Sequence, residues 1–178
     1  CALSSHTLVL AQLDTLYIQS KILGERITVY QTPPQLTSPN SDAQWIYFTD
    51  GQKLLDNGIL DSLDALSPSS QHTRKHYVFI SSMVQDQIQQ IDKRNEFFFC
   101  NPAYIDFFQQ ELIPKLEQSH ATPITAENRV LVGISFGGLN AAYFAAKSTH
   151  LFQSYALLSP ITYPCPDILT LIAFSSSP

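Results

Sequence analysis

The chain has 178 residues, of which 44% are hydrophobic and 14% are charged, and its formal net charge at pH 7 is −5. This length suits a single hydrophobic core, and the composition is typical of a globular protein rather than a disordered one. The acidic balance and the scattered Lys and Arg residues exclude nucleic acid as the main partner. No apolar run reaches the length of a membrane span.

The first predicted elements form an antiparallel hairpin at the edge of a sheet. Residues 13–20 and 26–32 alternate apolar and polar side chains, with a short polar connection between them. Residues 31–42 are rich in Pro, Ser and Asn, which predicts a surface loop. Residues 45–49 form a continuous apolar run, which predicts a buried parallel strand. The following Asp50-Gly51-Gln52 predicts a turn.

The middle of the chain continues the alternation of strands and helices. Leu and Ile recur with roughly helical spacing over residues 54–66, which predicts an amphipathic helix that Gly58 weakens. Residues 67–75 form a polar linker, and the apolar run at residues 76–81 predicts a second buried strand. Residues 82–100 are expected to form a long loop that shapes specificity.

The clearest predicted helix starts at Asn101, as the N-cap, and Pro102, at the first helical position. Its apolar face comprises Ile105, Phe108, Leu112 and Leu116. Residues 154–158 predict one more strand. Strands that alternate with helices over this length predict an α/β fold, with a mostly parallel sheet and helices on both faces.

Three of the six glycines lie within residues 133–138, in a G-x-S-x-G motif. An apolar, β-branched run precedes the motif and residues of helical spacing follow it, which predicts a strand, a tight turn and a helix. Ser135 lies at the apex, and Gly133 and Gly137 suit the turn because bulky neighbours would not fit beside the serine. This is the setting of a nucleophile elbow. The alternative is a glycine-rich turn that only packs a helix closely on a sheet.

Seven segments of the chain follow one another in the order seen in one enzyme family. They are residues 20–30, 47–52, 94–97, 111–114, 133–138, 150–152 and 158–160. In these segments the chain resembles the putative-esterase family of α/β-hydrolases, which includes enterochelin esterases, esterase D-type thioester hydrolases and mycolyltransferases. The resemblance implies that residues 13–178 are the N-terminal part of one α/β-hydrolase domain, with a sheet that stops short at its C-terminal side. Residues 1–12 would be a tether or a leader remnant.

The resemblance also implies ester chemistry at Ser135. A serine hydroxyl is a poor nucleophile unless a base removes its proton, and the negative charge that develops needs two backbone N–H donors. Phe136 follows the nucleophile and supplies one donor, and the resemblance places the other at Gln52. Arg94 and Glu96 lie where the family places substrate-facing groups. A structural salt bridge or an exposed, solvated pair is the alternative for these two charges.

The acid and the base of a catalytic triad are harder to place. In α/β-hydrolases the order along the chain is Ser, then Asp or Glu, then His. After Ser135 the sequence offers only Asp167 and His150. A helix of roughly 20 Å separates His150 from Ser135, so we expect His150 to cap that helix and keep Asp167 as a candidate acid. We expect the remaining histidines to be structural or exposed, and the triad partners to lie beyond Pro178.

The three cysteines, Cys1, Cys100 and Cys165, have neither a metal-ligand spacing nor a redox C-x-x-C motif. One internal disulfide is compatible with them, but free buried thiols are the expected state. Cys1 fits either the lipid-anchored N-terminus of a bacterial lipoprotein or an arbitrary start of the sequence. The first case places the protein in the cell envelope or periplasm, and the second in the cytoplasm.

The sequence therefore leaves two functions from different classes. The first is a serine esterase that hydrolyses a small-molecule carboxylic ester or thioester through an acyl-enzyme on Ser135, without a metal or a cofactor. The second is a catalytically inactive binding domain, or a truncated remnant, which the lack of a suitably placed downstream histidine favours. A peptidase on the same fold is less expected, because nothing in the sequence resembles the propeller or cap that restricts peptide access.

Overall fold

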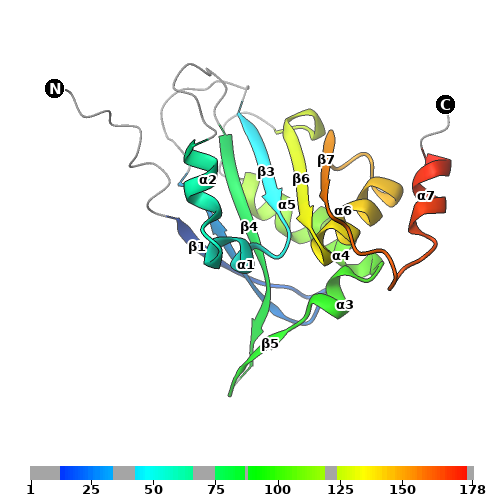
Figure 1. The fold of residues 1–178 in the computed structure, drawn as a ribbon. Helices are drawn as coiled ribbons and strands as arrows, with labels where there is room; N and C mark the ends of the chain where they lie inside the picture. The colour runs from blue at the N-terminus through cyan, green and yellow to red at the C-terminus, as the bar shows by residue number, and fades with distance from the viewer. Residues whose placement is uncertain (1–12, 34–42, 66–74, 87, 119–123, 176–178) are drawn as a thin grey trace.

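A computed structural model describes residues 13–33, 43–65, 75–86, 88–118 and 124–175 (Figure 1). The strands are β1 (Asp14–Gln19), β2 (Arg26–Gln31), β3 (Gln44–Phe48), β4 (Lys75–Gln85), β5 (Gln90–Asp92), β6 (Arg129–Ile134) and β7 (Ser154–Leu158). The α-helices are α1 (Gly51–Asp56), α2 (Ile59–Ala65), α3 (Arg94–Phe98), α4 (Pro102–Phe107), α5 (Ile113–Glu117), α6 (Phe136–Lys147) and α7 (Ile168–Ser175). The predicted tether at residues 1–12 and most of the predicted loop and linker segments lie outside the described residues.

The strands form one sheet in the order β1-β2-β4-β3-β6-β7, with β5 paired to β4. The central strands β4, β3, β6 and β7 are parallel to one another, whereas β1 pairs antiparallel with β2, and β2 and β5 pair antiparallel with β4. Among the described strands only β2 and β5 run against the others, which confirms the mostly parallel sheet and the hairpin at its edge. The carboxyl ends of β3, β6 and β7 meet at the lower edge of the sheet in Figure 1.

The sheet is covered by helices on both faces, as predicted. Helices α1 and α2 lie on one face, and α3 to α6 lie on the other (Figure 1). Side chains of β3 alternate between the two layers: Trp45 and Tyr47 join the larger core, and Phe48 joins the smaller one. The largest fully buried side chains are mainly aromatic: Trp45, Tyr47, Tyr104, Phe79, Phe98, Phe107, Phe108, Phe144 and Phe152.

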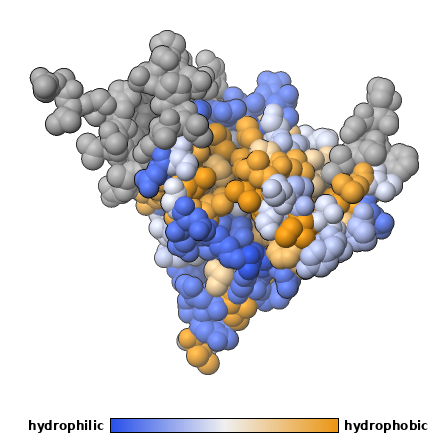
Figure 2. Space-filling model, in the orientation of Figure 1, coloured by the Kyte–Doolittle hydropathy of each residue, from blue (hydrophilic) through white to orange (hydrophobic). Residues whose placement is uncertain are grey.

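The face that carries α1 and α2 has the smaller core. Its buried residues are Phe48, Tyr77, Phe79 and Val132, against which the leucines and isoleucines of α1 and α2 pack. Figure 2 shows hydrophobic surface at the centre of this face. The partly buried strand residues Ile46, Val130 and Ala156 pack against the smaller core. No helix in the described part of the chain is both long enough and apolar enough to cross a bilayer.

Two predicted segments differ in detail from the structure. The single helix expected over residues 54–66 is divided, because Gly58 adopts a left-handed conformation (φ 73°) between α1 and α2. Residues 82–100 do not form one long loop. Strand β4 extends to Gln85, β5 returns antiparallel to it, and α3 follows.

The helix predicted at Asn101 starts as expected, since the Asn101 side chain accepts a hydrogen bond of 2.9 Å from the Ala103 N–H. The predicted apolar face is buried along its whole length. A π-helical turn (Phe108–Leu112) separates α4 from α5, and it directs Glu111 towards the hairpin. There the Glu111 carboxylate accepts hydrogen bonds from the Ser20 hydroxyl (2.5 Å) and the Lys21 N–H (2.9 Å).

A largely buried ion pair joins α5 to the start of β6. Arg129 donates two hydrogen bonds to the Glu117 carboxylate, of 2.6 and 2.7 Å, and the Tyr47 hydroxyl donates a third of 2.9 Å. Both charged side chains are only 11% exposed. Burial raises the pKa of Tyr47 well above its ordinary value, and the Glu117 carboxylate raises it further. The pair therefore ties together three elements that are distant in the sequence.

We expect Glu117→Ala to lower the free energy of unfolding by about 3 kcal/mol, because it leaves the Arg129 charge buried without its carboxylate. Urea denaturation measures this loss. The matched control is Glu96→Ala, which removes a 64% exposed carboxylate from a pair with Lys93 and is expected to cost at most about 1 kcal/mol. Equal losses in the two variants would contradict the prediction.

Candidate active site

Ser135 lies between the end of β6 and the start of α6, as the motif predicts. Its backbone has φ 59° and ψ −118°, a region that residues with a side chain rarely adopt and that costs roughly 1–3 kcal/mol. The Ser135 N–H donates to the Leu158 carbonyl (3.0 Å), and its carbonyl accepts from the N–H groups of Leu139 and Ile161, both at 3.2 Å. The side chain is half-buried, and its hydroxyl makes no hydrogen bond to any described residue.

The glycines of the motif are required by close contacts around the turn. A Cβ atom on Gly133 would overlap the carbonyl group of Gly137. A Cβ atom on Gly137 would lie 2.6 Å from the Thr49 hydroxyl oxygen, which itself lies 3.4 Å from the Gly137 carbonyl oxygen. The turn therefore brings α6 against both β6 and the end of β3, and any larger residue at these two positions would push them apart.

The other half of the site is the junction of β3 and α1. Asp50 is the N-cap residue of α1 and adopts a left-handed conformation (φ 59°). A Cβ atom on Gly51 would lie 2.6 Å from the backbone of Phe79, so the glycine is needed for the close packing of α1 on β4. Gln52 follows in the first turn of α1.

The two junctions lie side by side, because β3 and β6 are neighbouring parallel strands. Phe48 pairs with Val132, and the Thr49 N–H donates to the Val132 carbonyl (3.1 Å). The N–H groups in the first turn of a helix have no acceptor within that helix. The N–H groups of Gln52 and Phe136 are of this kind. They lie just after the ends of the neighbouring strands β3 and β6. Their joint role as an oxyanion hole stays a prediction.

A polar network behind Gln52 was not found from the sequence. The Gln52 amide donates to the Asp50 carboxylate (2.9 Å) and the Ser82 hydroxyl (2.8 Å), and it accepts from the Ser82 N–H (2.9 Å). The Ser82 hydroxyl also donates to Asp50 (2.8 Å), and Ser82 is fully buried. The sequence signal that could have indicated this network is the pair of adjacent serines, Ser81 and Ser82, after a buried apolar run. Two hydrogen bonds fix the Gln52 side chain to Ser82 of β4, and a third fixes it to Asp50.

Arg94 extends this network, whereas Glu96 does not. The Arg94 guanidinium lies 2.6 Å from the Asp92 carboxylate and 3.7 Å from that of Asp50. The hydrogen bond to Asp92 raises the pKa of Arg94. Glu96 instead pairs with Lys93 at 2.9 Å and is 64% exposed. Both residues thus form salt bridges, which was the alternative to substrate binding. A substrate-binding role for either residue stays a prediction.

The described histidines lie away from Ser135. His76 is at the start of β4, the opposite end from the elbow, where its ring packs on Trp45 (centroids 4.0 Å apart) and lies 3.3 Å from the Thr32 hydroxyl. His150 is exposed beyond α6, whose 12 residues span about 18 Å. The prediction that His150 caps this helix is wrong, because the cap is Ser148, whose N–H and hydroxyl both donate to the Phe144 carbonyl.

Asp167, the candidate acid, is exposed and directly precedes α7. Its backbone carbonyl accepts a hydrogen bond of 2.9 Å from the Leu171 N–H, in the first turn of that helix. A catalytic role for Asp167 stays a prediction. The described residues contain no group of three or more His, Cys, Asp or Glu side chains placed to hold a metal ion.

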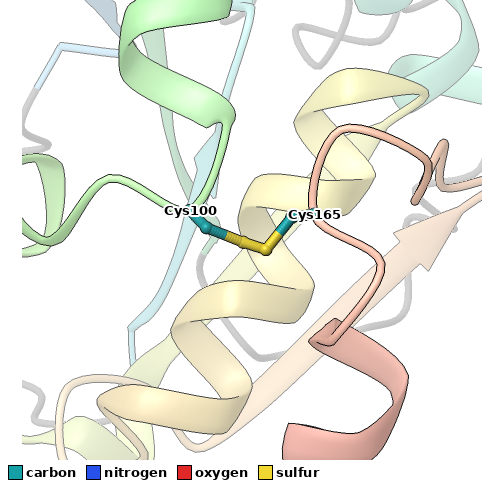
Figure 3. Close-up of a disulfide and its surroundings, with 2 residues drawn as sticks. All are labelled: Cys100 and Cys165. Carbon is teal, nitrogen blue, oxygen red and sulfur yellow. A yellow bond between two sulfur atoms is a disulfide. The ribbon is translucent and has the colours of Figure 1, made fainter.

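The expectation of free thiols is wrong for two of the three cysteines. Cys100 and Cys165 form a disulfide, with their Cα atoms 6.3 Å apart (Figure 3). The bond joins the turn between α3 and α4 to the segment that follows β7. The two residues are 65 positions apart in the sequence, and their proximity depends on the folded topology, so spacing alone does not reveal it. Cys1 lies outside the described residues.

The profile of the family described as "Putative esterase" matches residues 20–176, and the chain belongs to this family. No protein of curated function matches the chain.

Several solved structures share the fold. An IroE-like serine hydrolase from Shewanella oneidensis has a TM-score of 0.69 and 21% identity, over 92% of this chain and 56% of that one. The enterobactin esterase Fes from Shigella flexneri has a TM-score of 0.65 and 22% identity, over 79% and 35%. The siderophore hydrolase EstA from Aspergillus nidulans has a TM-score of 0.67 and 19% identity, over 92% and 62%. The chain thus has an α/β-hydrolase fold and spans between about a third and two thirds of these relatives.

We expect Gly133→Ala to destabilise the fold by about 3 kcal/mol or more, because the new methyl group would overlap the backbone of Gly137. Gly24→Ala is the matched control. Gly24 also has a special backbone (φ 71°), but a methyl group added there would have nothing within 4 Å, so only the backbone penalty of about 1 kcal/mol applies. Thermal or urea unfolding of both variants compares the two losses, and similar values would refute the crowding of the elbow.

Proposed function

We propose that the protein is a serine esterase that cleaves a small-molecule carboxylic ester or thioester through an acyl-enzyme on Ser135. The observation that carries this proposal is the strained Ser135 turn, whose hydroxyl makes no hydrogen bond to any described residue. Phe136 and Gln52, at the starts of α6 and α1, have backbone N–H groups without an acceptor in their own helix. Membership of an esterase family supports the same chemistry.

In the proposed reaction Ser135 Oγ attacks the ester carbonyl, and the N–H groups of Phe136 and Gln52 stabilise the negative oxygen of the tetrahedral intermediate. The bond to the leaving alcohol or thiol then breaks, and water later releases the acid from Ser135. A base must accept the serine proton. His76 and His150 lie away from the elbow, so neither is the proposed base.

The substrate class is proposed by analogy with the structural relatives. One of these is named an enterobactin esterase, and another a siderophore hydrolase. A small-molecule ester is therefore the proposed substrate of this protein as well. A lipid anchor at Cys1 stays a prediction from the sequence.

The second candidate function is a binding domain of the same fold that lacks catalysis. The positions of His76 and His150 favour it, since neither described histidine can act on Ser135. The two candidates differ in one respect that can be measured: only the esterase activates the Ser135 hydroxyl.

A fluorophosphonate probe is expected to label Ser135 in the full-length protein, because the probe reacts with activated serine nucleophiles. Ser135→Ala should abolish the labelling, and mass spectrometry of the labelled peptide identifies the site. Ser154→Ala, which removes an exposed hydroxyl at the start of β7, is the control and should label normally. A folded protein without label at Ser135 favours the binding domain.

Ser82→Ala is expected to lower kcat/KM by about tenfold, because it removes the hydroxyl that bonds both the Gln52 amide and Asp50, loosens the first turn of α1 and allows the Gln52 N–H donor to move. The matched control is Ser81→Ala. Ser81 is equally buried, at 2% exposure, but it bonds only to the backbone of Met83. Steady-state kinetics of both variants on an activated ester decide the matter, and equal losses would show that the Gln52 network has no special role.

A further inference from the structure

The Cys100–Cys165 disulfide joins two segments that both contact Phe136. The ring of Phe99, which precedes Cys100, packs edge-on against the Phe136 ring with centroids 5.1 Å apart. The centroid of the Tyr163 ring, two residues before Cys165, lies 6.2 Å from that of the Phe136 ring, and the two rings meet at 67°. The residue that follows the proposed nucleophile thus contacts two aromatic rings. The disulfide joins the two segments that carry these rings (Figure 3).

The segment after β7 also binds the backbone of Ser135 directly. The Ser135 N–H donates to the Leu158 carbonyl, and the Ile161 N–H donates to the Ser135 carbonyl. The same segment runs close to α6, because a Cβ atom on Gly138 would lie 3.0 Å from the Cα atom of Pro160. Residues 159–165, which we call the 159–165 segment, therefore hold the Ser135 carbonyl through the Ile161 N–H, whereas the Ser135 N–H is held by Leu158, the last residue of β7.

Near Tyr163 the 159–165 segment is held by few contacts other than the disulfide. The Tyr163 side chain is 75% exposed, so burial holds it weakly. Strand β7 anchors one end of the segment, and the buried Ile168 of α7 anchors the chain beyond the other. Between these anchors the disulfide is the covalent link to the body of the molecule. Its partner Cys100 lies in a tight turn, with φ 53° and an N–H that donates to the Phe98 carbonyl.

We propose that the Cys100–Cys165 disulfide is a positioning element of the active site. It holds the 159–165 segment and Phe99 against Phe136, and so keeps Ser135 and the Phe136 N–H in the geometry that acylation requires. This inference rests on the proposed esterase function. It adds that the enzyme reaches full activity only with the disulfide formed, a state that persists in oxidising compartments and is rare in a reducing cytosol.

Reduction provides the direct test. Dithiothreitol breaks the S–S bond, delivers one electron and one proton to each sulfur atom, and is itself oxidised to its cyclic disulfide. The rate of fluorophosphonate labelling of Ser135 is measured in the full-length protein before and after reduction, and in the double variant Cys100→Ala/Cys165→Ala. We expect labelling to slow by about tenfold in both cases. The double variant retains Cys1 and should not respond to dithiothreitol, which excludes effects through that thiol.

A loss of stability must be separated from a loss of positioning. Val29→Ala destabilises the fold from a fully buried site in β2 and leaves the disulfide intact. It should label at the normal rate at a temperature where it remains folded. Tyr163→Ala and Phe99→Leu also keep the disulfide, and both should slow labelling even if reduction unfolds the protein. Hydrogen exchange of the Ser135 and Ile161 amides should accelerate on reduction, while amides of the β3–β4 pairing do not.

Unchanged labelling after reduction, or an equal loss in Val29→Ala, would overturn the inference and leave the proposed function intact. If the oxidised protein is not labelled at all, the proposed function fails, and hydrogen exchange then decides the positioning role by itself. Exchange at Ser135 and Ile161 that does not respond to reduction would overturn that role.

Discussion

The close approach of backbone to backbone at Gly133 and Gly137 is the constraint on which the rest of the site depends. Because neither position has room for a Cβ atom, α6 can begin directly where β6 ends. This contact forces Ser135 into its rare conformation and brings the end of β3, at Thr49, against the start of α6. The proposed nucleophile and the two N–H donors therefore come together through local packing, before any contact with a substrate.

The charges near this site are compatible with the proposed oxyanion hole. Asp50 lies beside Gln52, and an isolated carboxylate there would oppose the negative charge that develops on the substrate. Its charge is countered by the Arg94 guanidinium, and its Oδ1 atom accepts hydrogen bonds from Gln52 and Ser82. On the core side burial raises the pKa of the Tyr104 hydroxyl, and the Asp50 carboxylate raises it further, so this phenol stays neutral. The network thus holds Gln52, while the Asp50 carboxylate keeps both its ion pair with Arg94 and its hydrogen bonds.

The elements whose determinants are local were predictable from the sequence. The elbow at Ser135, the cap at Asn101 and the buried strand at residues 45–49 each follow from a few neighbouring residues. The division of one helix at Gly58 was signalled but not predicted, since propensity alone does not decide whether a glycine ends a helix. The Ser82 contacts and the disulfide join positions 30 and 65 residues apart. Such contacts depend on the order of strands, which no local pattern specifies.

The proposed machinery separates into two parts with different physical origins. In the proposal the oxyanion is stabilised by backbone groups that the β3–α1 and β6–α6 junctions orient, and both junctions lie within the described residues. Proton transfer needs a side chain at hydrogen-bond distance from Ser135 Oγ, and neither described histidine is close. In serine hydrolases the donors and substrate binding alone retain a rate advantage over water when the triad is removed. The geometry at Ser135 is thus compatible with either an active esterase or a binding domain, and only the activation of the hydroxyl distinguishes them.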